Sequence, residues 1–315
     1  MGGSAVDNFI GHDLVRSWVK AAVKSGALPH AHLITGQDGI GKSYLAREIA
    51  ADILGVSPVK KYVDIIEYRT DKRSFGVDEV RDIIEEVNKK PFEGNKKVII
   101  IYHGEKLTVQ AQNAFLKTIE EPPKGIHIII TTDSSELLLD TIKSRCQIHK
   151  LLRLSKKQIK DFLRLHYPDL DEEMINLASA FSDGIPGRSE KFLKDEEFNN
   201  IRNITLKMLK DILTKDETLV IKYEQELAKY KNKEEDILNS LLSYIRDIMI
   251  YKDLENSKII INRDKLEDVK QLSNMFSYSK LYELIEVINK SREAFFSNVS
   301  AAVTYDIMLL NMLEV

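Results

Sequence analysis

Residues 36–43 carry the clearest chemical motif in the sequence. They read Gly-Gln-Asp-Gly-Ile-Gly-Lys-Ser and fit the pattern G-x-x-x-x-G-K-[ST] without a mismatch. In such a loop, glycines let successive backbone amides turn towards an anion, the lysine adds a positive charge and the serine hydroxyl serves Mg²⁺. The sequence therefore predicts a site for nucleotide phosphates, made by Gly36, Gly39, Gly41, Lys42 and Ser43.

The residues around this loop support the motif. An apolar strand-like run, AHLIT at 31–35, precedes it, and an amphipathic helical pattern, KSYLAREIAADIL, follows it. This strand–loop–helix order is the context in which such a loop binds phosphate. We therefore interpret residues 36–43 as a P-loop, and an accidental glycine turn is the alternative.

A second chemical feature lies at the end of the strand-like run VIIIY, residues 98–102. Hydrolysis of a nucleotide needs an acid there to orient Mg²⁺ and a second group to position water. In this sequence the two places fall on Tyr102 and His103. A phenol with a pKa of about 10 is neutral at pH 7, and a protonated imidazole would repel Mg²⁺. We therefore expect a site that holds a nucleotide without hydrolysing it; the nearby Glu105 is the alternative carboxylate.

Strand-like runs alternate with helical patterns from Phe9 to about Lys150. The helical pattern at 13–25 carries Leu14, Trp18, Ala21 and Ala22 at helical spacing, and Gly26 marks its end. This alternation predicts an α/β domain in which a parallel sheet is flanked by helices. The strand-like runs are AHLIT (31–35), VDIIEY (63–68), VIIIY (98–102) and HIIITT (127–132).

From Leu154 onward the strand-like runs stop and only helical patterns remain. Ser155-Lys156-Lys157-Gln158 is a capping box that predicts the start of a helix. We predict three domains, namely an α/β domain at 7–153, a small helical lid at 154–195 and an all-α domain at 196–315. The helices expected in the last domain span 197–214, 216–231, 233–253, 264–274, 278–292 and 298–313.

The composition of the 315 residues excludes several classes of protein. Hydrophobic residues make up 43% and charged residues 30%, as in a folded, water-soluble chain. The net charge of −3 gives no overall attraction to DNA, so contact with nucleic acid needs a local basic surface or partner subunits. No apolar run approaches the roughly 20 residues that span a bilayer, and no signal-peptide pattern opens the chain. We therefore expect a cytoplasmic protein without membrane contact.

Metal-binding patterns are missing from the sequence. Cys146 is the single cysteine, which excludes an intramolecular disulfide and a cysteine-rich zinc site. The seven histidines are scattered and show no metal-ligand spacing. We therefore expect no metal cluster, and we interpret His30 and His32, which precede the P-loop, as structural residues.

Several segments together resemble one protein family in their order and spacing. They are PHAHLITGQDGIGKS, KPFEGNKKVIII, LTVQAQNAFLKTIEEPP, TIKSRCQ and GIPGR. The same order is seen in bacterial clamp-loader subunits, the AAA+ proteins of the DNA polymerase III holoenzyme, and the similarity covers about residues 9–190. The helical remainder resembles the C-terminal collar of that family. The resemblance implies an AAA+ P-loop domain, a helical lid and an all-α collar domain for oligomerisation.

Within this family the chain resembles delta-prime subunits most. The tau and gamma motor subunits carry acidic residues where this sequence has Tyr102 and His103, and delta-prime subunits commonly lack them. The family also often carries a four-cysteine zinc module, but residues 53–64, ILGVSPVKKYVD, contain no cysteine. The resemblance therefore implies bound ATP or ADP, with Mg²⁺, no zinc and no hydrolysis by this chain.

The resemblance also gives Arg145 a catalytic role. In Ser144-Arg145-Cys146 it resembles the arginine finger that reaches the ATP of a neighbouring subunit. A guanidinium placed there stabilises the charge that develops in phosphoryl transfer. A surface arginine in a salt bridge is the alternative, and Cys146 is interpreted as a packing residue.

Three more residues are interpreted as nucleotide contacts through the resemblance. Thr132 resembles the sensor-1 residue, with Thr131 as the alternative. Arg188, at the end of GIPGR, resembles the sensor-2 arginine of the lid. Ile10 falls where the family packs its N-terminal segment around adenine, and an ordinary core contact is the alternative.

The function implied by the resemblance is that of a subunit in a heteromeric clamp-loader ring. It would bind nucleotide, supply Arg145 to an adjacent motor subunit and be held by its collar beside tau or gamma and delta subunits. The ring would load a sliding clamp onto primed DNA. The alternatives are a catalytically active AAA+ ATPase that uses Glu105 or Asp133, and a scaffold whose P-loop stays empty.

Overall fold

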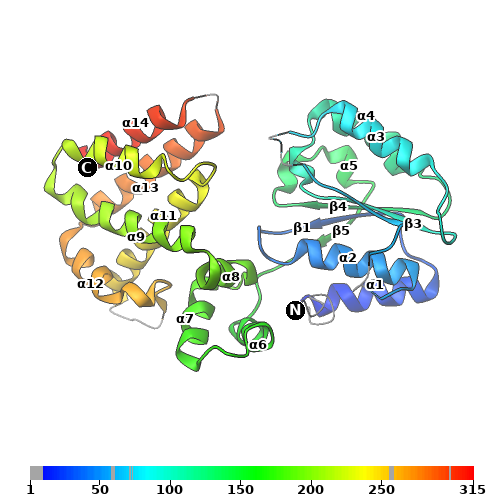
Figure 1. The fold of residues 1–315 in the computed structure, drawn as a ribbon, viewed down its shortest axis with the longest axis horizontal. Helices are drawn as coiled ribbons and strands as arrows, with labels where there is room; N and C mark the ends of the chain where they lie inside the picture. The colour runs from blue at the N-terminus through cyan, green and yellow to red at the C-terminus, as the bar shows by residue number, and fades with distance from the viewer. Residues whose placement is uncertain (1–9, 58–60, 71, 73, 255–258, 298) are drawn as a thin grey trace. The chain divides into compact units, whose positions relative to one another are not determined.

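The N-terminal part of the chain folds around a five-stranded parallel sheet (Figure 1). The computed structural model describes residues 10–57, 61–70, 72, 74–254, 259–297 and 299–315, so positions 7–9 and 58–60 of the sequence analysis lie outside the described residues. The strand order is β2-β3-β4-β1-β5, and every pairing is parallel. The predicted parallel sheet is confirmed. The strands are β1 (Ala31–Thr35), β2 (Ile65–Tyr68), β3 (Lys97–Ile101), β4 (Ile126–Thr132) and β5 (Gln147–Lys150).

Helices cover both faces of this sheet (Figure 1). On one face, α1 (Asp13–Ser25) and α2 (Lys42–Leu54) pack on Ile34, Val98, Ile100 and Ile129. On the other face, α3 (Val77–Asn88), α4 (Val109–Glu120) and the short α5 (Asp140–Lys143) pack on the alternate strand residues. Side chains of a strand point alternately to the two faces, so strands covered on both sides are apolar throughout.

Helix α1 ends where the sequence indicates but turns a different face to the core. Leu14 is 87% exposed and Trp18 is 41% exposed, whereas Val19 is buried. Val15 and Val23 pack beside Val19 on the core. The predicted helix is confirmed, but the apolar residues that indicated it do not form its core face. Two apolar stripes run side by side on this helix, and the β-branched one packs against the sheet.

The capping box and the helices expected in residues 196–315 lie close to their predicted positions. Ser155 and Gln158 form the predicted capping box at the start of α6 (Lys156–His166). The next helices are α7 (Glu172–Ser182) and α8 (Pro186–Lys194). Each helix expected in residues 196–315 has a counterpart among α9 (Glu196–Asp211), α10 (Thr218–Leu227), α11 (Glu234–Leu254), α12 (Leu266–Met275), α13 (Tyr278–Phe296) and α14 (Ala301–Glu314).

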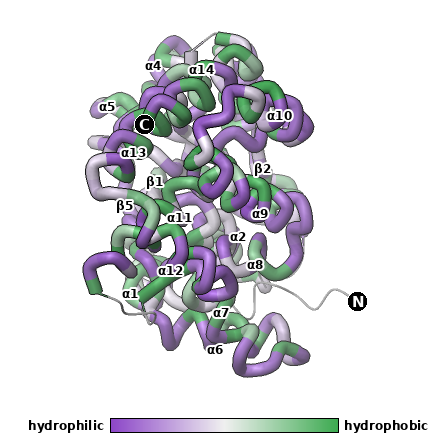
Figure 2. Tube along the Cα trace, turned by 90° about the vertical axis from the view of Figure 1, so that its left-hand side faces the viewer, coloured by the Kyte–Doolittle hydropathy of each residue, from purple (hydrophilic) through white to green (hydrophobic). Residues whose placement is uncertain are grey.

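The chain divides into two compact units. One contains residues up to Pro168 together with Gly184–Gly187, and the other contains Asp169–Asp183 with Arg188–Val315. The three-domain division inferred from the sequence stays a prediction. The helical unit has a core of its own, formed by residues of α9 to α14, and along the trace in Figure 2 the helices alternate hydrophilic and hydrophobic residues, as helices with one buried face do.

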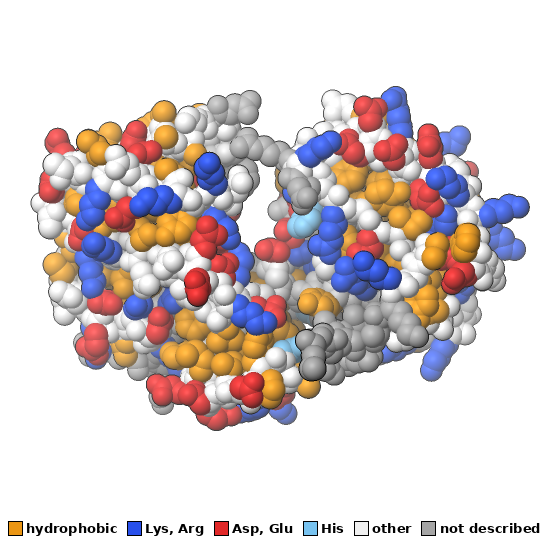
Figure 3. All heavy atoms as spheres, viewed as in Figure 1, with side chains coloured by type: hydrophobic (Ala, Val, Ile, Leu, Met, Phe, Trp, Pro, Cys, Tyr) orange, Lys and Arg blue, Asp and Glu red, His pale blue; other side chains and the backbone are white. Residues whose placement is uncertain are grey.

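The surface is mixed in charge. On the face shown in Figure 3, Lys and Arg side chains are interspersed with Asp and Glu, in keeping with the net charge of −3. None of the helices in the described residues has the length and apolarity that crossing a membrane requires.

Candidate nucleotide-binding site

The loop between β1 and α2 has the backbone of a phosphate-binding loop. Gly39 and Gly41 have backbone φ angles of 78° and 109°, which residues other than glycine rarely adopt. A Cβ atom on Gly39 would also lie 3.2 Å from the Cα of Gly187. The loop leads directly into α2 at Lys42, so its amides and the helix N-terminus face the same place. The structure thus brings the predicted P-loop residues together.

Lys42 is folded back over this loop. Its Nζ donates to the carbonyl oxygens of Gly36 and Gln37, at 2.8 and 2.9 Å. It also lies 2.5 Å from Oδ1 of Asp133, which follows β4. These contacts engage the three N–H groups of the ammonium. A phosphate that binds the loop must therefore draw Lys42 away from Asp133 or share it.

Tyr102, at the end of β3, stands where hydrolysis would need an acid. It is buried, and burial raises the pKa of its hydroxyl, which remains a neutral donor. The hydroxyl donates to Oε2 of Glu67 on β2 at 3.1 Å. Arg47 of α2 holds the same carboxylate with two hydrogen bonds of 2.9 Å. The guanidinium carbon of Arg69 lies 3.8 Å from the centre of the phenol ring.

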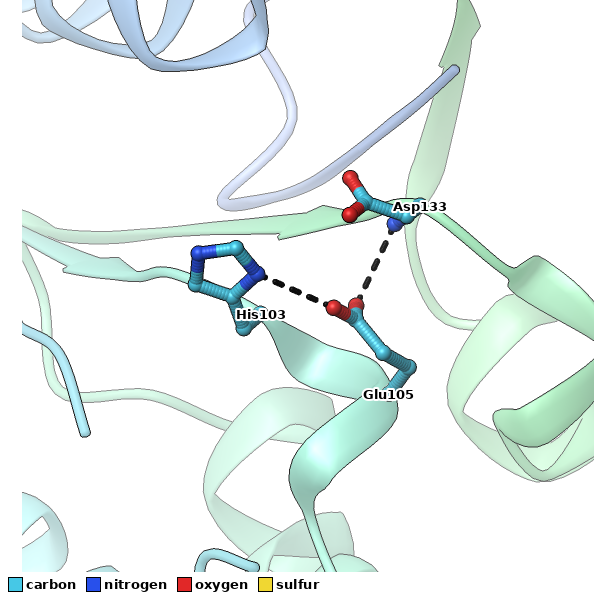
Figure 4. Close-up of side chains that lie close together, drawn as sticks. All are labelled: His103, Glu105 and Asp133. Carbon is cyan, nitrogen blue, oxygen red and sulfur yellow. Dashed lines mark hydrogen bonds and ion pairs between the residues drawn. The ribbon is translucent and has the colours of Figure 1, made fainter. Parts of the chain in front are cut away.

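Glu105 lies three residues after Tyr102, and its carboxylate already has partners within the chain (Figure 4). One oxygen lies 3.0 Å from Nδ1 of His103, and the other accepts from Oγ1 of Thr132 at 2.8 Å and from the backbone N–H of Asp133 at 3.2 Å. Burial would raise the pKa of Glu105, but these hydrogen bonds outweigh it and lower the pKa to about 2. Glu105 is therefore ionised at neutral pH.

His103, Glu105 and Asp133 meet at this end of the P-loop. Ligand atoms of the three side chains lie within 4.8 Å of one another. Burial raises the pKa of Asp133, and the charge of Lys42 opposes that rise. From the sequence, Glu105 and Asp133 were only alternative carboxylates, and neither was grouped with His103. The signal was available, because His103 lies two residues after β3 and Asp133 directly follows β4, and these two strands are parallel neighbours.

Thr132 and Thr131 face opposite sides of the sheet, so only one of them reaches this cluster. Thr132 is fully buried, and its hydroxyl bonds to Glu105. Its backbone oxygen accepts from Gly36 N at 3.2 Å. Thr132 therefore lies between the P-loop and the carboxylate. Its sensor-1 role stays a prediction.

The segment of Ile10 lies against the P-loop. Nε2 of His12 is 3.3 Å from the carbonyl oxygen of Ile40. A Cβ on Gly11 would come within 2.4 Å of a methyl of Leu154, which shows how closely this segment packs. Ile10 itself is half-buried. A contact with adenine stays a prediction.

Residues Gly184–Gly187 also close onto the P-loop. The backbone N–H of Gly187 donates to the carbonyl oxygen of Gly39 at 3.0 Å, and Ile185 is buried beside Ile40. Arg188 follows directly in the chain, and its Nη1 lies 3.7 Å from Oδ2 of Asp183. The sensor-2 role of Arg188 stays a prediction.

Comparison with known proteins assigns the chain to a family. A family model described as "DNA polymerase III, delta subunit" matches residues 11–155, and one described as "DNA polymerase III, delta subunit, C terminal" matches residues 196–314. The chain belongs to the DNA polymerase III clamp-loader family.

Two relatives of this clamp-loader subunit match nearly its whole length. DNA polymerase III subunit delta′ of Bacillus subtilis (strain 168) is 25% identical over 311 residues, which cover 93% of each protein. DNA polymerase III subunit gamma of Buchnera aphidicola subsp. Schizaphis graminum is 25% identical over 328 residues, which cover 91% of this chain and 90% of that protein. A solved gamma-subunit-related protein from Thermotoga maritima covers 94% of this chain and 98% of that one, at 22% identity and a TM-score of 0.44.

Arg145 of this clamp-loader subunit lies after α5, with its side chain one-third exposed. Its Nε donates to Oε2 of Glu120 at 3.0 Å, and its Nη1 donates to the carbonyl oxygen of Thr141 at 3.0 Å. The role of Arg145 as an arginine finger stays a prediction. Within this chain, Arg145 forms a salt bridge with Glu120, as the alternative interpretation expected. The adjacent Cys146 is partly buried, and burial raises the pKa of its thiol to about 12, so it is a packing residue and not a thiolate.

His30 directly precedes β1 and His32 lies within it, and both make contacts to other elements of the fold. Nε2 of His30 is 2.9 Å from the carbonyl oxygen of Ile119. His32 is fully buried, with its Nδ1 3.0 Å from Nε2 of His149 on β5. These contacts tie β1 to α4 and to the edge strand.

Proposed function

We propose that this chain is a delta-prime-type clamp-loader subunit that binds ATP or ADP and does not hydrolyse it. The observation that carries the proposal is the hydroxyl of Tyr102, which donates to Glu67 at the strand end where hydrolysis needs an acid. The site would then bind a nucleotide within an assembly without hydrolysing it.

The residues present fit a nucleotide. The P-loop has its glycines in conformations that open backbone amides to an anion, and Lys42 lies beside them. Ser43 begins α2 with Lys42 and offers a hydroxyl oxygen, the kind of ligand that Mg²⁺ prefers. Ser43 would hold the ion and the loop amides would orient the phosphates, whose negative charge the ion would offset.

The same residues are poorly suited to hydrolysis. Tyr102 presents a donor in place of an anionic acceptor, and the Glu67 carboxylate that it meets is already held by Arg47. Both oxygens of Glu105 accept hydrogen bonds from its own chain. Neither carboxylate is therefore available to orient Mg²⁺ or to take a proton from water without first losing partners.

Arg145 is proposed as the catalytic group that the subunit supplies to its neighbour. Its partner Glu120 is half exposed, and exposed ion pairs contribute only about 0–1 kcal/mol. Arg145 can therefore leave Glu120 and contact the γ-phosphate of ATP bound to an adjacent subunit at a small cost in free energy. A guanidinium in that place stabilises the charge of phosphoryl transfer.

The proposed partners follow from the family. The relatives are tau, gamma and delta-prime subunits of DNA polymerase III. We propose that the helical unit holds this chain in a ring with tau or gamma and delta subunits. The assembled ring would then act on a sliding clamp and primed DNA.

Calorimetric titration of the purified chain with ATP and ADP, with Mg²⁺, tests nucleotide binding. Lys42→Ala should weaken the affinity about tenfold or more, since it removes a charge from the phosphates. Lys24→Ala, an exposed lysine on α1, should leave the affinity unchanged. Absence of binding to either nucleotide would favour the scaffold with an empty P-loop.

An active ATPase is the second candidate, and the position of Glu105 favours it. Glu105 is ionised and touches Thr132 beside the P-loop. If it activates water, the chain should hydrolyse ATP, and Glu105→Gln should abolish that activity while ATP still binds. A basal rate equal in the two proteins would remove this candidate.

A further inference from the structure

We propose that His103, Glu105 and Asp133 form a binding site for a divalent transition-metal ion, which Lys42 blocks in this structure. The suitable ions are Mn²⁺, Co²⁺ and Zn²⁺, because the site offers one imidazole nitrogen and two carboxylates. This site is separate from the Mg²⁺ of a bound nucleotide, for which the chain offers Ser43.

The side chains are already close to the arrangement that such an ion requires (Figure 4). Nδ1 of His103 and Oε1 of Glu105 are 3.0 Å apart, and each of the three residues has a ligand atom within 4.8 Å of one on the other two. Two ligands at about 2.1 Å from one ion lie about 3 Å apart when they meet it at right angles. The ion would replace the proton between His103 and Glu105, and Asp133 would turn towards it.

The surroundings fix two of the ligands in place. The second oxygen of Glu105 is held by Thr132 and by the backbone N–H of Asp133. His103 lies between β3 and the short 3₁₀ turn Gly104–Lys106, and its Nδ1 is held by Oε1 of Glu105 at 3.0 Å. Partners of this kind orient metal ligands and strengthen their hold on the ion.

Lys42 now supplies the positive charge that the two carboxylates require. Its Nζ lies 2.5 Å from Oδ1 of Asp133 and is otherwise bonded to two carbonyl oxygens. Removing the ammonium leaves the carboxylate of Asp133 without the positive charge that now pairs with it. A divalent ion then binds in place of Lys42. Under the proposed function, on which this step rests, a bound phosphate withdraws Lys42 in the same way.

Metal titration without nucleotide tests the site directly. Mn²⁺ binding is followed by loss of the free-ion electron paramagnetic resonance signal, and Co²⁺ binding by its visible absorption, for the wild-type chain and Lys42→Met. We expect Lys42→Met to bind both ions about tenfold or more tightly than wild type, since a competing charge is gone. Circular dichroism melting shows that the variant is folded.

Second substitutions in the Lys42→Met chain identify the ligands. His103→Gln and Asp133→Asn should each weaken Mn²⁺ and Co²⁺ binding about tenfold or more. The matched controls His30→Gln and Glu136→Gln, which change an imidazole and an exposed carboxylate outside the cluster, should have no effect.

Equal metal affinity in the wild type and Lys42→Met would overturn the proposal, and so would affinity that His103→Gln and Asp133→Asn leave unchanged. The proposed function fails separately. If the wild-type chain binds neither ATP nor ADP, the proposed nucleotide binding is contradicted. If Lys42→Met then still binds metal more tightly than the wild type, the cation site is supported.

Discussion

Single residues decide what the P-loop site of this clamp-loader subunit can do. The P-loop itself was predictable, because its residues are contiguous and its chemistry lies in eight positions of the sequence. The engagement of Lys42 with Asp133 was not, since that contact joins residues from two separate loops. The same holds for the hydrogen bond between Glu105 and Thr132, which joins residues 27 positions apart in the sequence.

The buried pair of His32 and His149 makes stability depend on pH. Burial, together with the charge of His149, lowers the pKa of His32 to about 3, and burial lowers that of His149 to about 4. In the unfolded chain both titrate near pH 6.5. As the pH falls below 6.5, the unfolded chain therefore takes up protons first and the free energy of unfolding decreases.

We expect a loss on the order of 1.4 kcal/mol per pH unit for each histidine between about pH 6 and pH 4. Urea denaturation at pH 7.5, 6.0 and 5.0 measures the loss. His149→Gln should show a shallower decline than the wild type over this range. Parallel declines in the two proteins would show that the pair does not cause the effect.

At the scale of elements, the sequence indicated the helices and the inner strands better than the sheet edge. β5 was missed because Gln147–Lys150 is a short edge strand in which only His149 is buried, so it lacks an apolar run. The core face of α1 was not evident from the sequence either. Spacing alone does not distinguish the stripe of Leu14 and Trp18 from that of Val15, Val19 and Val23.

A matched pair of substitutions on α1 tests the observed face. Val19→Ala should lower the free energy of unfolding by about 2 kcal/mol, because it opens space in a packed core. Leu14→Ala should change it by less than about 0.5 kcal/mol, because that side chain is 87% exposed. Denaturant unfolding of both variants gives the comparison, and a larger cost for Leu14→Ala would contradict the structure.

At the scale of the whole molecule, the proposed function divides the work between subunits. Under that proposal, a chain that holds nucleotide and has Tyr102 in place of an acid would contribute to catalysis only through a group that it presents to a neighbour. We propose Arg145 as that group; within its own chain it pairs with the half-exposed Glu120. The family resemblance suggested this role from the sequence, whereas only the structure identifies Glu120 as the partner of Arg145 within the chain.

Arg145→Ala should reduce the DNA-stimulated ATPase rate of a clamp loader reconstituted with its motor and delta subunits. We expect a loss of about tenfold or more, since an arginine finger contributes about 10³–10⁵ at a single site. Gel filtration should show that the assembly is intact. Glu120→Gln, which frees Arg145 from its ion pair, serves as the control and should retain the wild-type rate. An undiminished rate with Arg145→Ala would exclude the finger role.

The central claim is that the site retains ATP without cleaving it, and the fate of bound ATP tests it most directly. The isolated chain is mixed in excess over γ-labelled ATP with Mg²⁺, and free phosphate is measured over hours beside Lys42→Ala. We expect the bound nucleotide to remain ATP, with phosphate formed no faster than in the variant. Steady phosphate release by the wild-type chain that Lys42→Ala abolishes would contradict the account.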